Sequence, residues 1–231
     1  MKLLLLLFSQ ACFCEVGKPI LPDIRTAVFG TKYFHETDQC FHCDARYFKK
    51  ITKDKEPIQH VELAGAYLTT MKKLGFETWI AHGSLLGWWW QGSSMGFDTD
   101  TDVQVLLETM DGMAANYNFT THTVSSRVTG EPRDYLLDVN PNYRDRMLGA
   151  GDLMLPNIID ARFIDMENGL FVDITALSPK NADSDIIQCK TPHRYHKSQI
   201  FPLIPTMFDG VSAFVPQDYR TIVRTSLPLL I

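Results

Sequence analysis

The chain has 231 residues, of which 45% are hydrophobic and 21% charged, and its formal net charge is −5. This length is enough to bury a substantial core, and the composition is ordinary for a globular domain. The negative charge argues against nucleic acid as the general partner, so any phosphate-binding site must be built locally.

The first fourteen residues are arranged as in a secretory signal peptide. Lys2 precedes the apolar run Leu3–Phe8, small residues follow around Ala11, and the run is too short to span a bilayer. This pattern predicts a protein of the secretory pathway, in the Golgi lumen or secreted. An uncleaved signal that anchors the chain to the membrane through its N-terminus is the alternative. The glycosylation acceptor sequence Asn118-Phe119-Thr120 agrees with a lumenal route.

Three cysteines follow the signal segment: Cys40, Cys43 and Cys189. In an oxidising compartment a disulfide is the default, either Cys40 with Cys43 or one of these with Cys189, which leaves one odd thiol. A zinc site is the alternative, because Cys40, His42 and Cys43 could be completed by His35 or Cys189.

Apolar residues recur at helical spacing from Ile58 to Leu74, with Pro57 near the start and Gly75 just past the end. This spacing predicts a core-facing helix. We expect it to pack on a short strand that begins at Thr78.

The most informative stretch runs from Trp79 to Leu107. It predicts a strand over Thr78–Ala81, a Gly83-Ser84 turn that opens a helical turn, and a second strand that begins with acids. Side chains alternate along a strand, so Asp100, Asp102 and Gln104 share one face, and Val103, Val105 and Leu107 share the other.

Two ionised acids about 7 Å apart on a buried strand are unfavourable unless a cation lies between them. A divalent cation suits their oxygens. Gly83 lets the backbone approach a ligand, and the N–H groups that start the helical turn form an anion site suited to phosphate. Metal beside phosphate indicates phosphoryl or nucleotidyl transfer. The plain alternative is that Asp100 and Asp102 belong to a solvated turn.

Beyond the acidic strand, the pattern predicts a helix over 108–116 and strands over 121–128 and 135–139. Gly130-Glu131-Pro132 is expected to form the turn between these strands.

Asn168-Gly169 lies between two apolar alternating runs and predicts a hairpin with a two-residue turn. In that register Ile164 lies opposite Asp173, and Arg162 lies opposite Thr175. Asp173 is then an acid in an otherwise apolar strand, where acids are normally paired or metal-bound. Arg162 shares its face and is either a phosphate clamp or a plain ion-pair partner of Asp173 or Asp160.

Basic residues and histidines gather from Cys189 to Lys197. Such a charge run usually forms a solvated loop. The alternative is a lip that attracts a sugar nucleotide or an anionic acceptor.

The segment His82-Gly83-Ser84-Leu85-Leu86-Gly87-Trp88-Trp89-Trp90, followed by Phe97-Asp98-Thr99-Asp100-Thr101-Asp102-Val103-Gln104-Val105, resembles the LicD and fukutin family of nucleotidyltransferase-fold proteins. The triple tryptophan and the Val-Gln-Val ending are most similar to the fungal branch, which includes proteins of cell-wall and N-glycan mannosylphosphorylation. Lys32–Glu36 and Asp44–Phe48 resemble the same branch. Where the family usually has Pro-Trp, this chain has Gly96-Phe97.

The resemblance implies an α+β nucleotidyltransferase (polymerase-beta-like) fold, with a mixed sheet flanked by helices, over residues 57–231. An extension over 15–56 and the signal segment over 1–14 precede it. The resemblance also implies a third carboxylate on a neighbouring strand, at the position of Asp173. The catalytic residues and ligands of Mg²⁺ or Mn²⁺ are then Asp100, Asp102 and Asp173, with Asp173 also placed to accept a hydroxyl proton. The residues expected to bind substrate are His82, Gly83, Ser84, Asp98 and Arg162.

We therefore expect metal-dependent transfer of a phosphosugar, in the first instance mannose phosphate, from GDP-mannose or a CDP-linked donor to a glycan hydroxyl. One alternative is a non-catalytic regulator that binds a partner transferase. Another is a glycosyltransferase whose Asp-x-Asp motif binds a metal-nucleotide complex. Nucleic acid is not expected as a partner.

Overall fold

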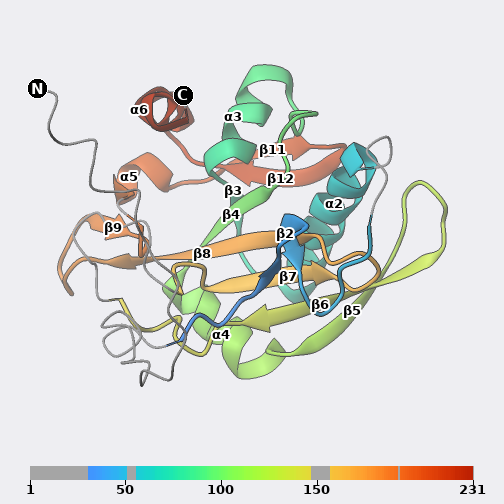
Figure 1. Cartoon of the computed structure of the whole chain (residues 1–231). Coiled ribbons are helices and arrows are strands. Elements are labelled where there is room, and N and C mark those ends of the chain that lie inside the picture. The colour runs from blue at the N-terminus through green and yellow to red at the C-terminus, as the bar shows by residue number, and fades with distance from the viewer. Residues whose placement is uncertain (1–30, 51–55, 147–156, 192, 231) are drawn as a thin grey trace, which may run out of the picture.

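The structure is a computed structural model. It describes residues 31–50, 56–146, 157–191 and 193–230 (Figure 1). The predicted signal segment lies outside these residues. Within them, no helix has both the length and the apolar character needed to cross a membrane.

An eight-stranded mixed sheet forms the centre of the molecule (Figure 1). Its strands run in the order β10-β9-β8-β7-β6-β5, with β4 beside β8 and β3 beside β4. The bounds are β3 Trp79–Ile80, β4 Thr101–Leu106, β5 Thr120–Ser125, β6 Pro132–Val139, β7 Ala161–Asp165, β8 Phe171–Pro179, β9 Ile186–Gln188 and β10 Arg194–His196. The β4–β8 pair is parallel, and the other described pairs are antiparallel.

Helices and two small hairpins surround this sheet (Figure 1). The helices are α2 Glu56–Leu74, α3 His82–Gln91, α4 Leu107–Tyr117, α5 Lys197–Ile200 and α6 Tyr219–Leu230. The hairpins are β1 Glu36–Thr37 with β2 Cys40–Asp44, and β11 Ile204–Phe208 with β12 Val211–Val215. This arrangement confirms the predicted α+β fold with a mixed sheet flanked by helices.

The two faces of the sheet are covered by different parts of the chain. Helices α2 and α4 both contact β8, and their buried side chains join Phe163 and Val172 in the main core. Ile164 and Phe171 are the neighbours of these two residues in β7 and β8. They belong to a second cluster, which includes Tyr47 of the N-terminal segment. Because successive side chains point to opposite faces, Asp173 lies on the face of this second cluster.

The predicted elements from Ile58 to Tyr117 are confirmed with changes in their bounds. The acidic strand is β4, Thr101–Leu106, so Asp100 lies just before it and Leu107 begins α4 instead of continuing the strand. The helix predicted up to Leu74 is α2, and the short strand before Ala81 is β3. The Gly83-Ser84 turn opens the full helix α3 rather than a single turn. One face of β4 is buried, whereas on the face of Asp102 only Gln104 is buried and Asp102 and Leu106 are half-buried.

The predicted two-residue turn at Asn168-Gly169 is wrong, although the hairpin itself is confirmed. Arg162 pairs with Asp173 and Ile164 with Phe171, two residues away from the predicted register. The Asp165 carboxylate accepts hydrogen bonds from the Glu167 N–H at 3.0 Å and the Asn168 side chain at 3.0 Å, so the turn begins at Asp165. A shift of two residues preserves the face, so Arg162 still lies on the side of Asp173.

Gly169→Ala is expected to lower the free energy of unfolding by about 2–3 kcal/mol. Gly169 has φ +86°, and a Cβ there would lie 2.9 Å from the backbone O of Asp44 and N of Phe48. The control is Gly75→Ala, because Gly75 has φ +76° with nothing within 4 Å of an added Cβ. Urea denaturation should show about 1 kcal/mol for the control, and equal losses would contradict the steric argument.

Candidate active site

The structure brings the predicted acids together on one face of the sheet. Asp102 on β4 and Asp173 on β8 are direct partners in the parallel register. Partners on adjacent strands point to the same side, so the two carboxylates are neighbours. Asp100, two residues before Asp102, and Asp98 lie close enough to raise the pKa of Asp102 through their charges.

Burial and like charges disfavour ionisation at this site. The pKa of Asp102 is well above its ordinary value, first because the side chain is buried and then because of the charges of Asp100, Asp173 and Asp98. Burial also raises the pKa of Asp173, and Arg162 opposes that rise. The negative charges of these carboxylates are thus only partly offset by positively charged side chains of the protein.

This donor set fits a hard divalent cation, because carboxylate oxygens are its preferred ligands and a cation would relieve their repulsion. Over the described ranges, no three His, Cys, Asp or Glu side chains already converge as metal ligands do. Asp100, Asp102 and Asp173 thus offer the oxygen ligands that a cation site needs, but their side chains would have to move closer together to bind the ion.

The start of α3 is joined directly to the acids. Ser84 Oγ accepts a hydrogen bond from the Asp102 N–H at 3.0 Å, and the Gly83 N–H donates to the Asp102 carboxylate. A Cβ on Gly83 would lie 3.1 Å from Asp98 Oδ2, so glycine leaves room for that carboxylate. His82 precedes them with φ +47°, a left-handed conformation that is costly outside glycine and gathers at functional sites.

Arg162 forms the ion pair that the sequence offered as one alternative. Its Nε donates to Asp173 Oδ1 at 2.8 Å, and its Nη2 donates to Glu36 Oε1 at 2.6 Å. Asp160, the other predicted partner, instead pairs with Arg146 and Lys190. Arg162 Nη1 is buried and has no hydrogen-bond acceptor among the described residues.

The segment from Cys189 to Lys197 is only partly the solvated loop that the charge run favours. Lys190 is buried and pairs with Asp160, and the His193 ring packs on His82 with centroids 4.3 Å apart. Burial first, and then His193, lower the pKa of His82 to about 3, so this ring is neutral at physiological pH. The sequence places His193 in the charge run but does not predict its contact with His82, because no spacing rule links the two residues.

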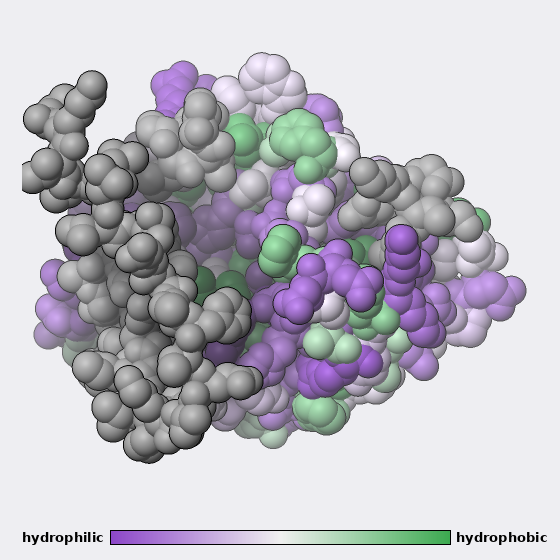
Figure 2. All heavy atoms as spheres, viewed as in Figure 1, coloured by the Kyte–Doolittle hydropathy of each residue, from purple (hydrophilic) through white to green (hydrophobic). Residues whose placement is uncertain are grey.

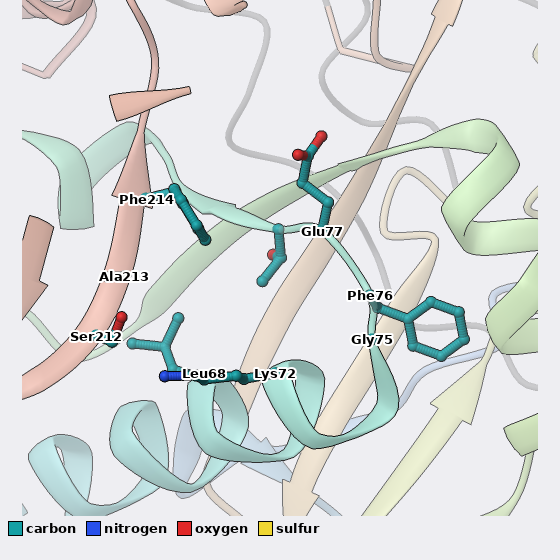
Figure 3. Close-up of a pocket in the computed structure, with 9 residues that line it drawn as sticks. Leu68, Lys72, Gly75, Phe76, Glu77, Ser212, Ala213 and Phe214 are labelled. Carbon is teal, nitrogen blue, oxygen red and sulfur yellow. The ribbon is translucent and has the colours of Figure 1, made fainter. Parts of the chain in front are cut away.

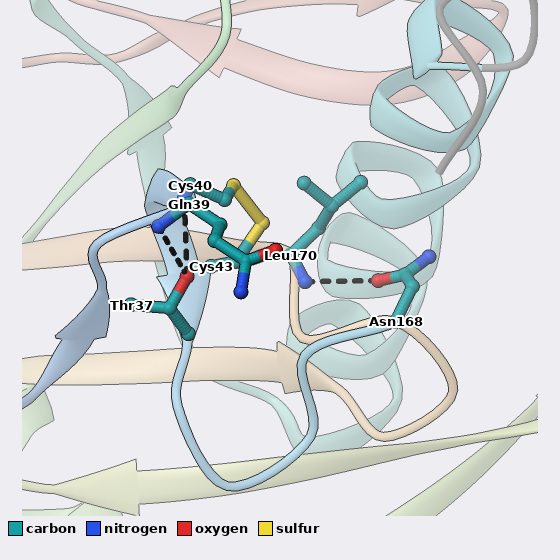
Figure 4. The surroundings of a disulfide bond; sticks show 6 residues. All are labelled: Thr37, Gln39, Cys40, Cys43, Asn168 and Leu170. Atoms are coloured by element: carbon teal, nitrogen blue, oxygen red, sulfur yellow. Dashed lines mark hydrogen bonds between the residues drawn. A yellow bond between two sulfur atoms is a disulfide. The ribbon is translucent and has the colours of Figure 1, made fainter. Parts of the chain in front are cut away.

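The cysteines form the disulfide that the sequence favoured over zinc. Cys40 is bonded to Cys43, and Cys189 is a buried free thiol. Figure 4 shows this bond close to Leu170, whose N–H donates to Asn168 Oδ1 in the turn that leads to β8.

A separate pocket of about 360 Å³ lies between the end of α2 and β12 (Figure 3). Leu68, Glu77 and Phe214 line it, and none of the acids of the site does. On the face in Figure 2, the described hydrophobic residues form small separate patches among hydrophilic ones. The carboxylate cluster therefore remains the candidate site.

A mixed sheet with aspartates on adjacent strands, beside a glycine-opened helix, is the architecture of a nucleotidyltransferase-type domain. The family model described as "LicD/FKTN/FKRP, nucleotidyltransferase domain" matches residues 75–218. The chain belongs to this family, as the motifs around His82 and Asp102 predicted.

Two curated relatives come from Saccharomyces cerevisiae. The chain is 30% identical over 152 residues to Mannosyltransferase regulator 4, a match that covers 62% of this chain and 12% of the relative. It is 32% identical over 112 residues to Mannosyltransferase regulator 14, which covers 47% of this chain and 11% of that protein. The chain thus spans only a small part of the length of both relatives.

Proposed function

We propose that this chain transfers a phosphosugar, in the first instance mannose phosphate, from a nucleotide donor to a glycan hydroxyl in the secretory pathway. The observation that carries the proposal is the register pairing of Asp102 with Asp173, beside the start of α3, in a LicD-family domain. Half-buried acids that repel each other on adjacent strands are costly without a cation, and a cation beside a helix start suits a phosphorylated donor.

In this proposal, Asp100, Asp102 and Asp173 hold Mg²⁺ or Mn²⁺, which when bound offsets the negative charge of the phosphoryl group. The Ser84 N–H at the start of α3 is the donor offered to the phosphates, with His82, Gly83 and Asp98 beside it. Arg162 acts in this proposal through its ion pair with Asp173.

The proposed reaction is an in-line displacement at the phosphorus that carries the sugar. The bond between the acceptor oxygen and phosphorus forms, and the bond from phosphorus to the leaving nucleoside monophosphate breaks. Asp173 accepts the hydroxyl proton, a role that is helped by the rise of its pKa above the ordinary value, which burial causes and Arg162 opposes.

The released nucleotide tests the proposal. The full chain is incubated with GDP-mannose, or a CDP-linked donor, and a glycan acceptor, with and without Mn²⁺. Phosphosugar transfer releases the nucleoside monophosphate, whereas glycosyl transfer from the same donor releases the diphosphate. A diphosphate product would assign the Asp-x-Asp motif to a glycosyltransferase.

A non-catalytic regulator is the second candidate, and the observation that favours it is that both relatives are named mannosyltransferase regulators. In that case the chain acts through a partner transferase. The chain would then raise the turnover of that transferase, and Asp102→Asn would leave this stimulation unchanged.

The affinity of the chain for Mn²⁺ is expected to rise with pH between about pH 6 and pH 8. The pKa of Asp98 is raised to about 7, first by burial and then by its hydrogen bond to Asp100. The folded chain therefore holds a proton on Asp98 to a higher pH than the unfolded chain does. The stability that this proton gives the folded chain is lost as pH rises through about 7. Calorimetric titration across this range measures the affinity. Asp98→Asn should flatten the profile, and a pH-independent affinity in the unmodified chain would contradict the expectation.

A further inference from the structure

The N-terminal segment reaches the acids through Arg162, although it lies outside residues 75–218, which the family model matches. Phe34 and Glu36 both reach Arg162, the ion-pair partner of Asp173. The function proposed above does not use these two residues.

Arg162 is held from several directions at once. The Phe34 ring lies 4.8 Å and the Phe171 ring 3.6 Å from the guanidinium carbon. Glu36 binds Nη2 at 2.6 Å, and Asp173 binds Nε at 2.8 Å. The Arg162 side chain is only 4% exposed. A guanidinium fixed in this way presents a rigid donor to the carboxylate it binds.

The β1–β2 hairpin that carries Glu36 is fastened to the sheet close to this contact. The disulfide between Cys40 and Cys43 lies within β2, and Cys43 forms a β-bridge with Leu170 (Figure 4). The next residue, Asp44, donates its N–H to the Gly169 carbonyl at 2.7 Å. Glu36 pairs with Asp44 across the hairpin, so these bonds set its position over β7 and β8.

We propose that Glu36 is a positioning residue of the carboxylate site: through Arg162 it fixes the orientation of Asp173 beside Asp102. The inference rests on the proposed function. It adds the β1–β2 hairpin, through Glu36, to the elements that determine the geometry of the site. Without Glu36, Nη2 loses its acceptor, and the guanidinium is held only by Asp173 and the two rings. Groups that orient a metal ligand typically change affinity or activity 10–100-fold when removed.

The test compares Glu36→Ala, Glu36→Gln and Tyr33→Phe in the full chain. Tyr33→Phe is the matched control, because it removes a 2.8 Å hydrogen bond from the same segment to Asp138 on β6 and leaves the partners of Arg162 intact. Three quantities are measured: kcat and KM for the donor, Mn²⁺ affinity by calorimetry, and the melting temperature.

Glu36→Ala is expected to lower kcat and weaken Mn²⁺ binding by about tenfold or more, with little change in KM. Glu36→Gln should recover part of this loss, because its amide oxygen still accepts from Arg162. Tyr33→Phe should leave kcat and Mn²⁺ affinity unchanged, even if its melting temperature falls.

Equal effects of Glu36→Ala and Tyr33→Phe on kcat and Mn²⁺ affinity would overturn the inference and leave the hairpin a structural role. An unmodified chain that binds Mn²⁺ without turnover, with weaker binding in Glu36→Ala, would refute the transferase proposal and support the positioning role. A chain that binds no Mn²⁺ would overturn both.

Discussion

Asp102→Asn is expected to lower phosphosugar transfer by about a thousandfold, the scale on which a central electrostatic group acts in catalysis. Asparagine keeps the shape of the side chain but removes the charge that would hold the cation. The same change should leave the metal-free chain at least as stable, because it removes the repulsion that Asp100 and Asp173 exert on Asp102. A variant that loses activity while keeping or gaining stability would mark a residue kept for function.

The matched control for this experiment is Asp134→Asn. Asp134 is an exposed acid of β6, hydrogen-bonded by Thr123 on the neighbouring strand, so the variant loses the same charge outside the site. Turnover should be unchanged in the control. If Asp102→Asn retained full turnover, Asp102 would have no catalytic role.

Asp160→Ala is expected to lower the free energy of unfolding by about 3–5 kcal/mol, the usual cost of removing one partner from a buried ion pair. The Asp160 carboxylate is fully buried and accepts from Arg146 Nη1 at 3.1 Å and the Ala176 N–H at 2.7 Å, with Lys190 Nζ at 3.0 Å. Alanine would leave the buried Lys190 and the half-buried Arg146 without this carboxylate. Urea denaturation measures the loss.

An exposed ion pair provides the comparison. Asp185 pairs with His196 at 3.1 Å, and both side chains are more than half exposed. Asp185→Ala should therefore cost less than about 1 kcal/mol. A similar loss of unfolding free energy in both variants would show that burial does not explain how much the Asp160 network stabilises the fold.

Local pattern was enough to predict most of the helices and strands. The apolar spacing up to Leu74 and the alternation around Val103 each reflect one element packing on one core, which a short window of sequence records. The turn at Asp165 could not be predicted in this way. There the side chains of Asp165 and Asn168 bind the backbone and override the usual preference of Asn-Gly for a two-residue turn.

The acids of the site were found through the motif, but their environment was not. Asp102 and Asp173 pair through a parallel register, which no local signal specifies. Lys190 and His193 looked like part of a solvated charge run, yet Lys190 pairs with the buried Asp160 and His193 packs on His82, both from distant parts of the chain. Such partners become visible only when the strands are placed in order.

The parallel pairing of β4 with β8 also has a consequence for folding. Strands β5 to β8 can pair as successive antiparallel neighbours, whereas β4 reaches β8 only after the chain from Leu107 to Leu170 has closed into a loop. Closing so long a loop is slow, because its entropy is lost before the new contacts form. We therefore expect Asp102 and Asp173 to meet late in folding, so that partly folded chains keep these acids apart and in water.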